Sequence, residues 1–225
     1  MKEHKTLKGV FEIEKAKNRK LIYTRNLSPG KQVYGEILIS DGGIEYREWD
    51  PRRSKVGAAI IKNISQIGIK ENDVVLYLGA ASGTTSSHIS DIVGRKGFIF
   101  ALDFAPRVVR DLVFVCEDRK NITPILADAN KPESYMHLVT EVDAIIQDVA
   151  QKNQAEIFLK NCKTFLKKGG FGLLALKARS VDVAKDPRRI FEEVRKDLEK
   201  EMIVADYRTL DPFEKDHAFF VCKKR

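Results

Sequence analysis

Cysteine is scarce in this 225-residue sequence, which contains only Cys116, Cys162 and Cys222, each in apolar surroundings. Their wide separation excludes the close pair spacing of a metal-binding motif, so no metal site is expected. A disulfide framework is not expected either, because an odd number of distant cysteines is typical of reduced thiols in a protein core. Reduced thiols indicate a cytoplasmic protein.

Long apolar runs are also missing. None approaches the roughly 20 residues that span a bilayer, and charged residues begin at Lys2, so neither membrane association nor a secretory leader is expected. Internal repeats and low-complexity segments are absent as well. Hydrophobic residues make up 43% of the chain, which supports a core, and the length suits one α/β domain with a small additional module.

Positive charge is concentrated near the start of the chain. The net charge is +8, and positions 1–55 hold 13 basic and 8 acidic residues, which leaves +3 for the rest. A basic segment indicates a polyanionic partner such as RNA or DNA, although the same charge also serves solubility. No aromatic-rich platform for stacking RNA bases is visible, so this chain is not expected to read bases itself.

Residues 1–54 are expected to form a small, mostly β module. Asp41-Gly42-Gly43 between two apolar runs is a strong hairpin signal. A module with so few core residues should pack against the rest of the chain. Four short apolar runs in it predict strands, at residues 10–13, 21–24, 36–39 and 44–49.

Strands and helices alternate through residues 55–225. Ser54 is the expected cap of a helix whose apolar positions run at helical spacing to Ile67. The remaining helices are expected from near Thr85, over 106–118, from Pro132, over 151–166 and over 187–199. Five strand patterns lie between the helices, at 74–78, 97–102, 122–127, 142–146 and 171–176.

This alternation requires a mostly parallel sheet with helices on both faces. The last two strands, 202–210 and 218–222, are joined by a loop too short for a parallel crossover, so they should be antiparallel. We therefore predict an α/β fold: a Rossmann-like sheet closed by an antiparallel final hairpin, the form of S-adenosylmethionine-dependent methyltransferases. Residues 55–225 would form this domain.

Polar residues follow the predicted parallel strands, at the sheet edge where open α/β sheets bind ligands. Asp103, Asp128, Asp148 and Lys177 end four of the strands. One aspartate at such a place is as often a turn former, but the recurrence favours a ligand site. The first strand instead leads into a turn of small residues around two glycines: Gly79, Ala80, Ala81, Ser82, Gly83, Thr84 and Thr85.

These strand ends predict a nucleoside cofactor. Asp103 comes 20 residues after Gly83, a distance at which a carboxylate can accept hydrogen bonds from both hydroxyls of a ribose. Asp128, with Ala129 beside it, is placed to meet the amine of an adenine. The G-x-G-x-x-G order of dinucleotide sites is absent, which disfavours NAD and a dehydrogenase. We expect S-adenosyl-L-methionine.

Three motifs in this order resemble the fibrillarin family: Leu76–Thr85, Asp148-Val149-Ala150-Gln151 and Asp216-His217-Ala218. The similarity covers nearly the whole chain, including Arg53-Ser54-Lys55, and a glycine- and arginine-rich N-terminal extension is lacking, as in archaeal members. The resemblance implies an RNA-guided ribose 2′-O-methyltransferase of the box C/D ribonucleoprotein, acting on pre-rRNA and also on tRNA. It implies four partners: a Nop-domain scaffold protein, a kink-turn-binding protein, a box C/D guide RNA and the substrate rRNA.

The resemblance also implies a catalytic tetrad around the target hydroxyl: Lys55, Asp148, Lys177 and His217. The resemblance also adds Phe104 and Gln151 to the cofactor site. The other expected members of that site are residues 79–85, Asp103, Asp128, Ala129 and Asp148. Asp103 stands where the family often has glutamate, and the carboxylate is kept.

A hydroxyl must lose its proton to attack a methyl group, and a lysine can take that proton only when neutral, a form favoured by burial or a second cation. We expect Lys177 to be the base and Lys55 the second cation. Asp148 would orient Lys177, and His217 would position the lysines or the ribose. Two alternatives stay open: a methyltransferase acting on a base or a protein side chain, and a non-catalytic RNA-binding subunit.

Overall fold

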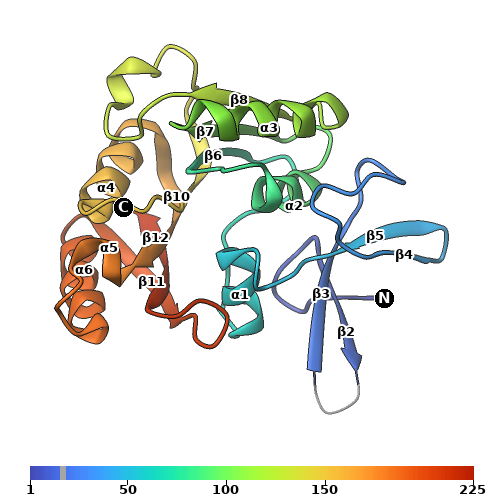
Figure 1. Ribbon diagram of the computed structural model, residues 1–225, viewed down its shortest axis with the longest axis horizontal. Helices are drawn as coiled ribbons and strands as arrows, with labels where there is room; N and C mark the ends of the chain where they lie inside the picture. Colours follow the sequence, from blue (N-terminus) through green and yellow to red (C-terminus); the bar gives the residue numbers. More distant parts are fainter. Residues whose placement is uncertain (16–18) are drawn as a thin grey trace.

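The computed structural model describes residues 1–15 and 19–225, which form two sheets (Figure 1). The smaller sheet is antiparallel and has the order β1-β2-β3-β5-β4. None of the helices in the described ranges is long and apolar enough to cross a bilayer. The strands of the smaller sheet are β1 (Lys2–Glu3), β2 (Val10–Lys15), β3 (Arg19–Arg25), β4 (Leu38–Asp41) and β5 (Ile44–Glu48).

The four predicted strands of this module are present with shifted boundaries, and the two-residue β1 was not predicted. The strand expected over 36–39 begins at Leu38 because Glu36 turns inward. Its carboxylate accepts hydrogen bonds from the N–H groups of Val33 and Tyr34 and pairs with the guanidinium of Arg47 at 2.6 Å. Because the carboxylate of Glu36 is buried with these partners, its main chain does not join the strand, which begins two residues later.

The larger sheet has the order β11-β12-β10-β9-β6-β7-β8. Pairings among β6 to β10 are parallel, and β12 runs antiparallel to both of its neighbours, so the predicted fold class is confirmed. Its strands are β6 (Val74–Leu78), β7 (Phe98–Asp103), β8 (Ile122–Leu126), β9 (Val142–Gln147), β10 (Leu166–Lys177), β11 (Met202–Thr209) and β12 (His217–Lys224).

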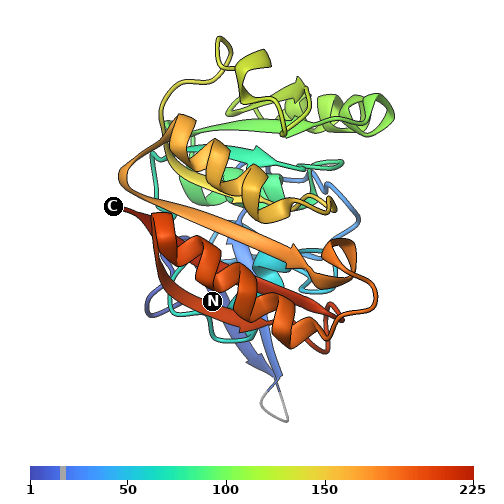
Figure 2. The same ribbon diagram turned by 90° about the vertical axis from the view of Figure 1, so that its left-hand side faces the viewer.

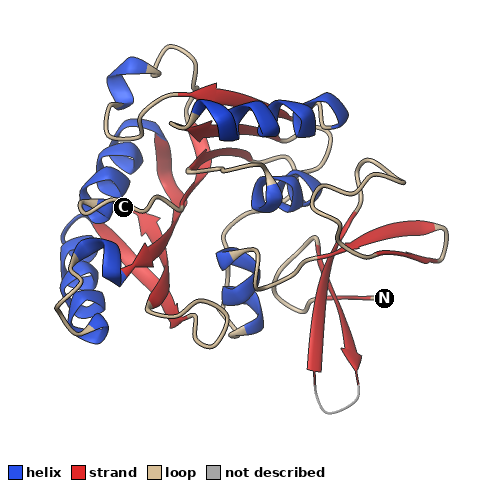
Figure 3. Ribbon diagram, viewed as in Figure 1, coloured by secondary structure: helices blue, strands red, loops and turns tan. Residues whose placement is uncertain are grey.

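Helices cover both faces of this sheet (Figure 3). On one face, α1 and α2 lie between the two sheets, and on the other α4 and α6 lie side by side (Figure 2). The helices are α1 (Lys55–Ile61), α2 (Thr84–Val93), α3 (Pro106–Asp118), the short 3₁₀ helix η2 (Pro132–Ser134), α4 (Gln154–Phe165), α5 (Ala178–Val181) and α6 (Pro187–Glu201).

Three helix predictions differ from the structure. Helix α1 ends at Ile61 and not at Ile67, because Asn63 adopts a φ of 58°, which a right-handed helix cannot contain. The apolar spacing continues past this break because Ile64 and Ile67 still enter the core. Helix α4 begins at Gln154 instead of Gln151, and the four-residue α5 was not predicted.

The small sheet shares its core with the large one. Leu7, Val10, Ile22 and Trp49 belong to the same buried cluster as the inner faces of α1 and α2. A module of this size has too little core of its own to fold alone. The division into residues 1–54 and 55–225 stays a prediction, and the shared core makes us expect that both parts unfold together.

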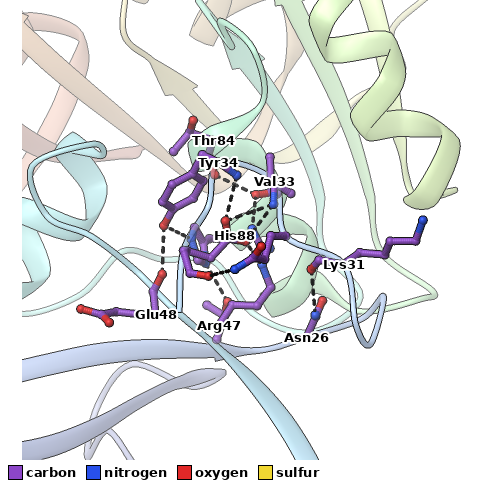
Figure 4. A network of polar contacts seen from close by, with 12 residues as sticks. Asn26, Lys31, Val33, Tyr34, Arg47, Glu48, Thr84 and His88 are labelled. Atoms are coloured by element: carbon purple, nitrogen blue, oxygen red, sulfur yellow. Dashed lines mark hydrogen bonds and ion pairs between the residues drawn. The ribbon is translucent and has the colours of Figure 1, made fainter. Parts of the chain in front are cut away.

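A buried polar network also joins the small sheet to α2 (Figure 4). Arg47 from β5 is fully buried and pairs with Glu36 and, at 2.9 Å, with Asp91 of α2, while Arg119 pairs with the other oxygen of Asp91 at 2.6 Å. Buried charges are tolerated only when paired in this way. The network therefore fixes how the small sheet sits on α2.

Candidate active site

A cavity of about 210 Å³ lies at the carboxyl ends of the parallel strands. Its polar lining includes carboxylates from the ends of three strands, and Ile157 of α4 adds an apolar wall. The surrounding residues that sequence reasoning missed are Leu102, Ala127, Asn130, Val149, Ala150 and Ile157. Seven of the predicted cofactor residues line the cavity: Gly79, Asp103, Phe104, Asp128, Ala129, Asp148 and Gln151.

Gly79 directly follows β6, lines the cavity and lies against the main chain of Asp148, which follows β9. It has a φ of 79°, and a Cβ added there would lie 2.3 Å from the carbonyl oxygen of Asp148. Only glycine fits this position, both for its conformation and for its space. The glycine therefore lets the chain after β6 pack directly against the main chain of Asp148 at the cavity wall.

The rest of the predicted glycine turn, Ala80 to Thr85, does not line the cavity. Gly83 takes a left-handed conformation and precedes α2, and Thr85 is buried and donates a hydrogen bond to Ser54 Oγ at 3.0 Å. This bond connects the turn to the cap of α1. Contact of Ala80, Ala81, Ser82, Gly83, Thr84 and Thr85 with the cofactor stays a prediction.

Asp103 organises the turn from the neighbouring strand. Its Oδ2 accepts a hydrogen bond from Ala81 N at 3.0 Å, and its Oδ1 accepts one from Ala105 N at 3.1 Å. Each carboxylate oxygen can accept a second hydrogen bond. Asp103 is thus held rigidly and still has capacity for two hydroxyl groups, as its predicted role requires.

Lys55 and Asp148 form the first half of the predicted tetrad. Ser54 caps α1 by accepting a hydrogen bond from Gly57 N, which places Lys55 in the first turn of the helix. Lys55 Nζ lies 2.8 Å from Asp148 Oδ2, and the two side chains are 21% and 26% exposed. Asp148 therefore has a different partner from the one expected, since its carboxylate binds Lys55 rather than Lys177.

Lys177 and His217 form the second half. They are register partners at the ends of the antiparallel strands β10 and β12, so their side chains emerge next to each other on one face of the sheet. Within the described ranges, no ion pair neutralises Lys177, whose side chain is exposed. The structure thus brings the tetrad together as two pairs on neighbouring strand ends.

The hydrogen bonding of His217 fixes its tautomer. Its Nδ1 lies 2.7 Å from the carbonyl oxygen of Lys215, which can only accept a hydrogen bond. Nδ1 must therefore carry the proton, and in the neutral ring Nε2 is left as an acceptor. The side chain is buried, so the residues around it restrict the orientation of the ring.

Gln154 is a site residue that sequence reasoning missed. Its buried side-chain amide donates a hydrogen bond to Lys177 O at 3.1 Å and accepts one from Lys177 N at 2.9 Å. The available signal was its position on the same helical face as Ile157 and Phe158. A glutamine there has to find partners inside the protein.

The comparisons with known proteins concern the chain as a whole. The sequence model of the family described as Fibrillarin matches residues 1–225. A fibrillarin-like rRNA/tRNA 2′-O-methyltransferase from Thermococcus onnurineus is 51% identical over 224 residues, covering 100% of this chain and 99% of the relative.

Solved structures are also similar over nearly the whole chain. Aeropyrum pernix fibrillarin, in complex with natively bound S-adenosyl-L-methionine, has 46% identity and a TM-score of 0.90, over 98% of this chain and 96% of that one. The fibrillarin in a fibrillarin/Nop5p complex has 37% identity and a TM-score of 0.88, and the match covers 100% of both chains. With a family match over its entire length and relatives this similar, the chain belongs to the fibrillarin family.

Proposed function

We propose that this chain transfers a methyl group from S-adenosylmethionine to ribose 2′-hydroxyls of RNA. The observation that carries the proposal is the placement of two pairs, Lys55 with Asp148 and Lys177 with His217, at the ends of neighbouring strands, where Asp148 also lines the cavity. Asp148 belongs to both the cavity and the tetrad, so it joins cofactor binding to the reaction. The relatives' name, rRNA/tRNA 2′-O-methyltransferase, supports this reading.

The cavity residues suit S-adenosylmethionine. Asp103 has the free acceptor capacity for two ribose hydroxyls, Asp128 offers a carboxylate to an adenine amine, and Ile157 and Ala129 provide apolar surface for the base. Gly79, at the wall of the same cavity, is the proposed neighbour of the amino acid portion. When bound, this cofactor supplies an electrophilic methyl group on a positively charged sulfur.

Lys177 is the proposed base. In its neutral form it accepts the proton of the 2′-hydroxyl as the oxygen becomes nucleophilic, and it ends as an ammonium. Within the described part of the chain no carboxylate pairs with it, so no ion pair has to break first. His217, held with Nε2 as an acceptor, can then receive a hydrogen bond from the new ammonium.

Lys55 and Asp148 have a positioning role in this scheme. A free carboxylate near a sulfonium would favour the ground state over the transition state, in which the positive charge is lost. The bond from Lys55 compensates that carboxylate and fixes its direction.

We further propose that the chain works within a box C/D ribonucleoprotein. A fibrillarin has been solved with Nop5p, which supports a Nop-domain partner. A guide RNA and a kink-turn-binding protein would supply the base recognition that this sequence lacks, with pre-rRNA and tRNA as substrates. A cytoplasmic location is proposed from the three cysteines, all of which are free thiols in the structure.

The decisive experiment measures methyl transfer from labelled S-adenosylmethionine to a guided RNA in the assembled complex. One RNA carries the natural target nucleotide, and the other has a 2′-deoxy substitution there. We expect labelling of the first RNA only. Equal labelling of both would mean a base target, labelling of protein would mean a side-chain target, and cofactor binding without any transfer would mean a non-catalytic subunit.

A further inference from the structure

The main chain of Lys177 is held by a side chain. Gln154, the first residue of α4, presents its amide edge-on to Lys177, with Nε2 3.1 Å from the carbonyl oxygen and Oε1 2.9 Å from the N–H nitrogen. The amide donates a hydrogen bond to the C=O of Lys177 and accepts one from its N–H, as a neighbouring strand would. The side chain of Gln154 is completely buried.

The sheet itself explains why such a substitute is needed. Parallel pairing between β9 and β10 stops at Leu174, opposite Gln147, three residues before Lys177. Beyond this point the N–H and C=O of Lys177 on the β9 side have no strand partner, and unpaired buried main-chain groups are costly. Gln154 supplies both hydrogen bonds where the ladder has ended.

The same two bonds determine how Lys177 faces His217. Both main-chain groups of Lys177 are directed toward Gln154, away from β12, so Lys177 and His217 form a non-hydrogen-bonded pair of the antiparallel ladder. Side chains approach most closely in pairs of this kind. Holding the main chain of Lys177 therefore also holds its side chain beside His217.

Gln154 is in turn anchored to the strand that carries the other half of the tetrad. Gln147, the last residue of β9, is fully buried, and its Nε2 donates to Gln154 O at 2.7 Å. Asp148 follows it directly and binds Lys55. A continuous set of bonds thus runs from Lys55 through the end of β9 and Gln154 to Lys177.

We propose that Gln154 is a positioning residue that sets the placement of the Lys177 amine relative to the target hydroxyl. This inference rests on the proposed function, in which Lys177 accepts the proton. A displacement of about 1 Å at a reacting group can lower a rate by roughly a hundredfold, so two hydrogen bonds to the main chain of Lys177 matter for turnover beyond their contribution to stability. Gln154 does not line the cofactor cavity.

Gln154→Met tests the inference, because methionine keeps the length and volume of the side chain and removes both hydrogen bonds. In single-turnover methyl transfer by the assembled complex, we expect a rate lower by about 10- to 100-fold. The affinity for S-adenosylmethionine should stay within about twofold of wild type, since the cavity lining is intact. Gln154→Asn, which keeps the amide but is too short to reach both groups, should lose rate in the same direction.

A matched control separates positioning from stability. Asn121 is another buried amide; it bonds Ser90 and Gly94 next to the start of β8, at the opposite end of the sheet. Asn121→Leu should lower the melting temperature about as much as Gln154→Met and leave the rate unchanged.

Each outcome has one meaning. A wild-type rate in whichever Gln154 variant folds overturns the inference, and so does an equal loss of rate in Asn121→Leu. The proposed function fails separately if the wild-type complex labels 2′-deoxy RNA as well as the natural target, or if Lys177→Arg remains active.

Discussion

The ammonium of Lys55 lies 2.8 Å from the Oδ2 of Asp148 and so joins the first turn of α1 to the end of β9. The N-terminal end of a helix favours anions, so a lysine there is unfavourable unless a negative charge lies near it. The carboxylate of Asp148 supplies that negative charge. Because both side chains are partly exposed, the pair contributes no more than about 1 kcal/mol to stability. The main effect of the pair is therefore to fix the positions of the two side chains.

Lys55→Met should consequently affect methyl transfer far more than folding. We expect the transfer rate to fall at least about tenfold, because Asp148 loses its only ion-pair partner in the described structure, with a change in unfolding free energy under about 1 kcal/mol. Single-turnover assays and urea unfolding measure the two effects. Lys200→Met, which removes an exposed lysine paired with Asp197 at 2.7 Å, is the control and should change neither. A fully active Lys55→Met would remove Lys55 from the site.

Lys177→Arg tests the proposed base directly. A guanidinium keeps its proton at any pH a protein tolerates, so this variant should lose nearly all transfer while binding the cofactor normally. The wild-type rate should rise with pH through the neutral and alkaline range, because the neutral amine is the active form. Measuring the rate at saturating S-adenosylmethionine across that range provides the test. A flat profile would argue against a lysine base.

His88 makes stability depend on pH in a predictable direction. Burial holds its pKa well below the usual 6.5, and the nearby Arg47 and Arg119 act in the same direction. The unfolded chain takes up a proton near pH 6.5 and the folded one does not, so stability is full above about pH 6.5 and falls as pH decreases below it. One such group contributes at most about 1.4 kcal/mol per pH unit.

Urea unfolding between pH 7.5 and 5 measures this slope. In wild type we expect stability to decrease toward pH 5, and in His88→Gln the decrease should be smaller, although the variant is less stable at every pH because Tyr34 and Thr24 lose their partner. His137→Gln, at an exposed histidine, is the control and should keep the wild-type slope. Identical slopes in all three proteins would contradict the assignment to His88.

The fold was predictable because apolar runs and turn residues that are close in the sequence indicate its strands and helices. The strand of Val74–Leu78 and the turn at Gly79 follow from neighbouring residues, and the tetrad positions followed from a family resemblance. Partners brought together by tertiary structure were not predictable. Nothing near Arg47 indicates Asp91 of α2 as its partner, and nothing near Gln154 indicates the main chain of Lys177.

Hydrophobic periodicity gave a wrong prediction for the end of α1, because buried side chains continue beyond the helix. The apolar spacing through Ile64 and Ile67 predicts a longer α1, and both side chains are indeed in the core. They reach it after the helix has ended at Ile61, because Asn63 has turned the chain. Hydrophobic periodicity reports which side chains are buried, and it does not by itself report the conformation that buries them.

Asp216 holds the loop before β12 against the end of β10. Its Oδ2 accepts a hydrogen bond from Arg179 Nε at 3.0 Å, and its carbonyl oxygen accepts one from Ala178 N at 3.0 Å, so residues next to Lys177 and His217 are tied together. Asp216 also has a φ of 58°, a left-handed conformation that costs a Cβ-bearing residue roughly 1–2 kcal/mol. Two substitutions separate these features.

Asp216→Gly removes the carboxylate and also the conformational cost of a Cβ at positive φ. Asp216→Ala removes the carboxylate and keeps that cost. We expect Asp216→Ala to be less stable than Asp216→Gly by about 1 kcal/mol, by urea unfolding. Both should lose transfer rate to a similar extent, because both lose the bond to Arg179 that holds Lys177 and His217 in place. Asn72, with a φ of 70° away from the site, is the control: Asn72→Ala and Asn72→Gly should differ in stability alone. A transfer rate that followed stability across all four variants would mean that Asp216 only supports the fold.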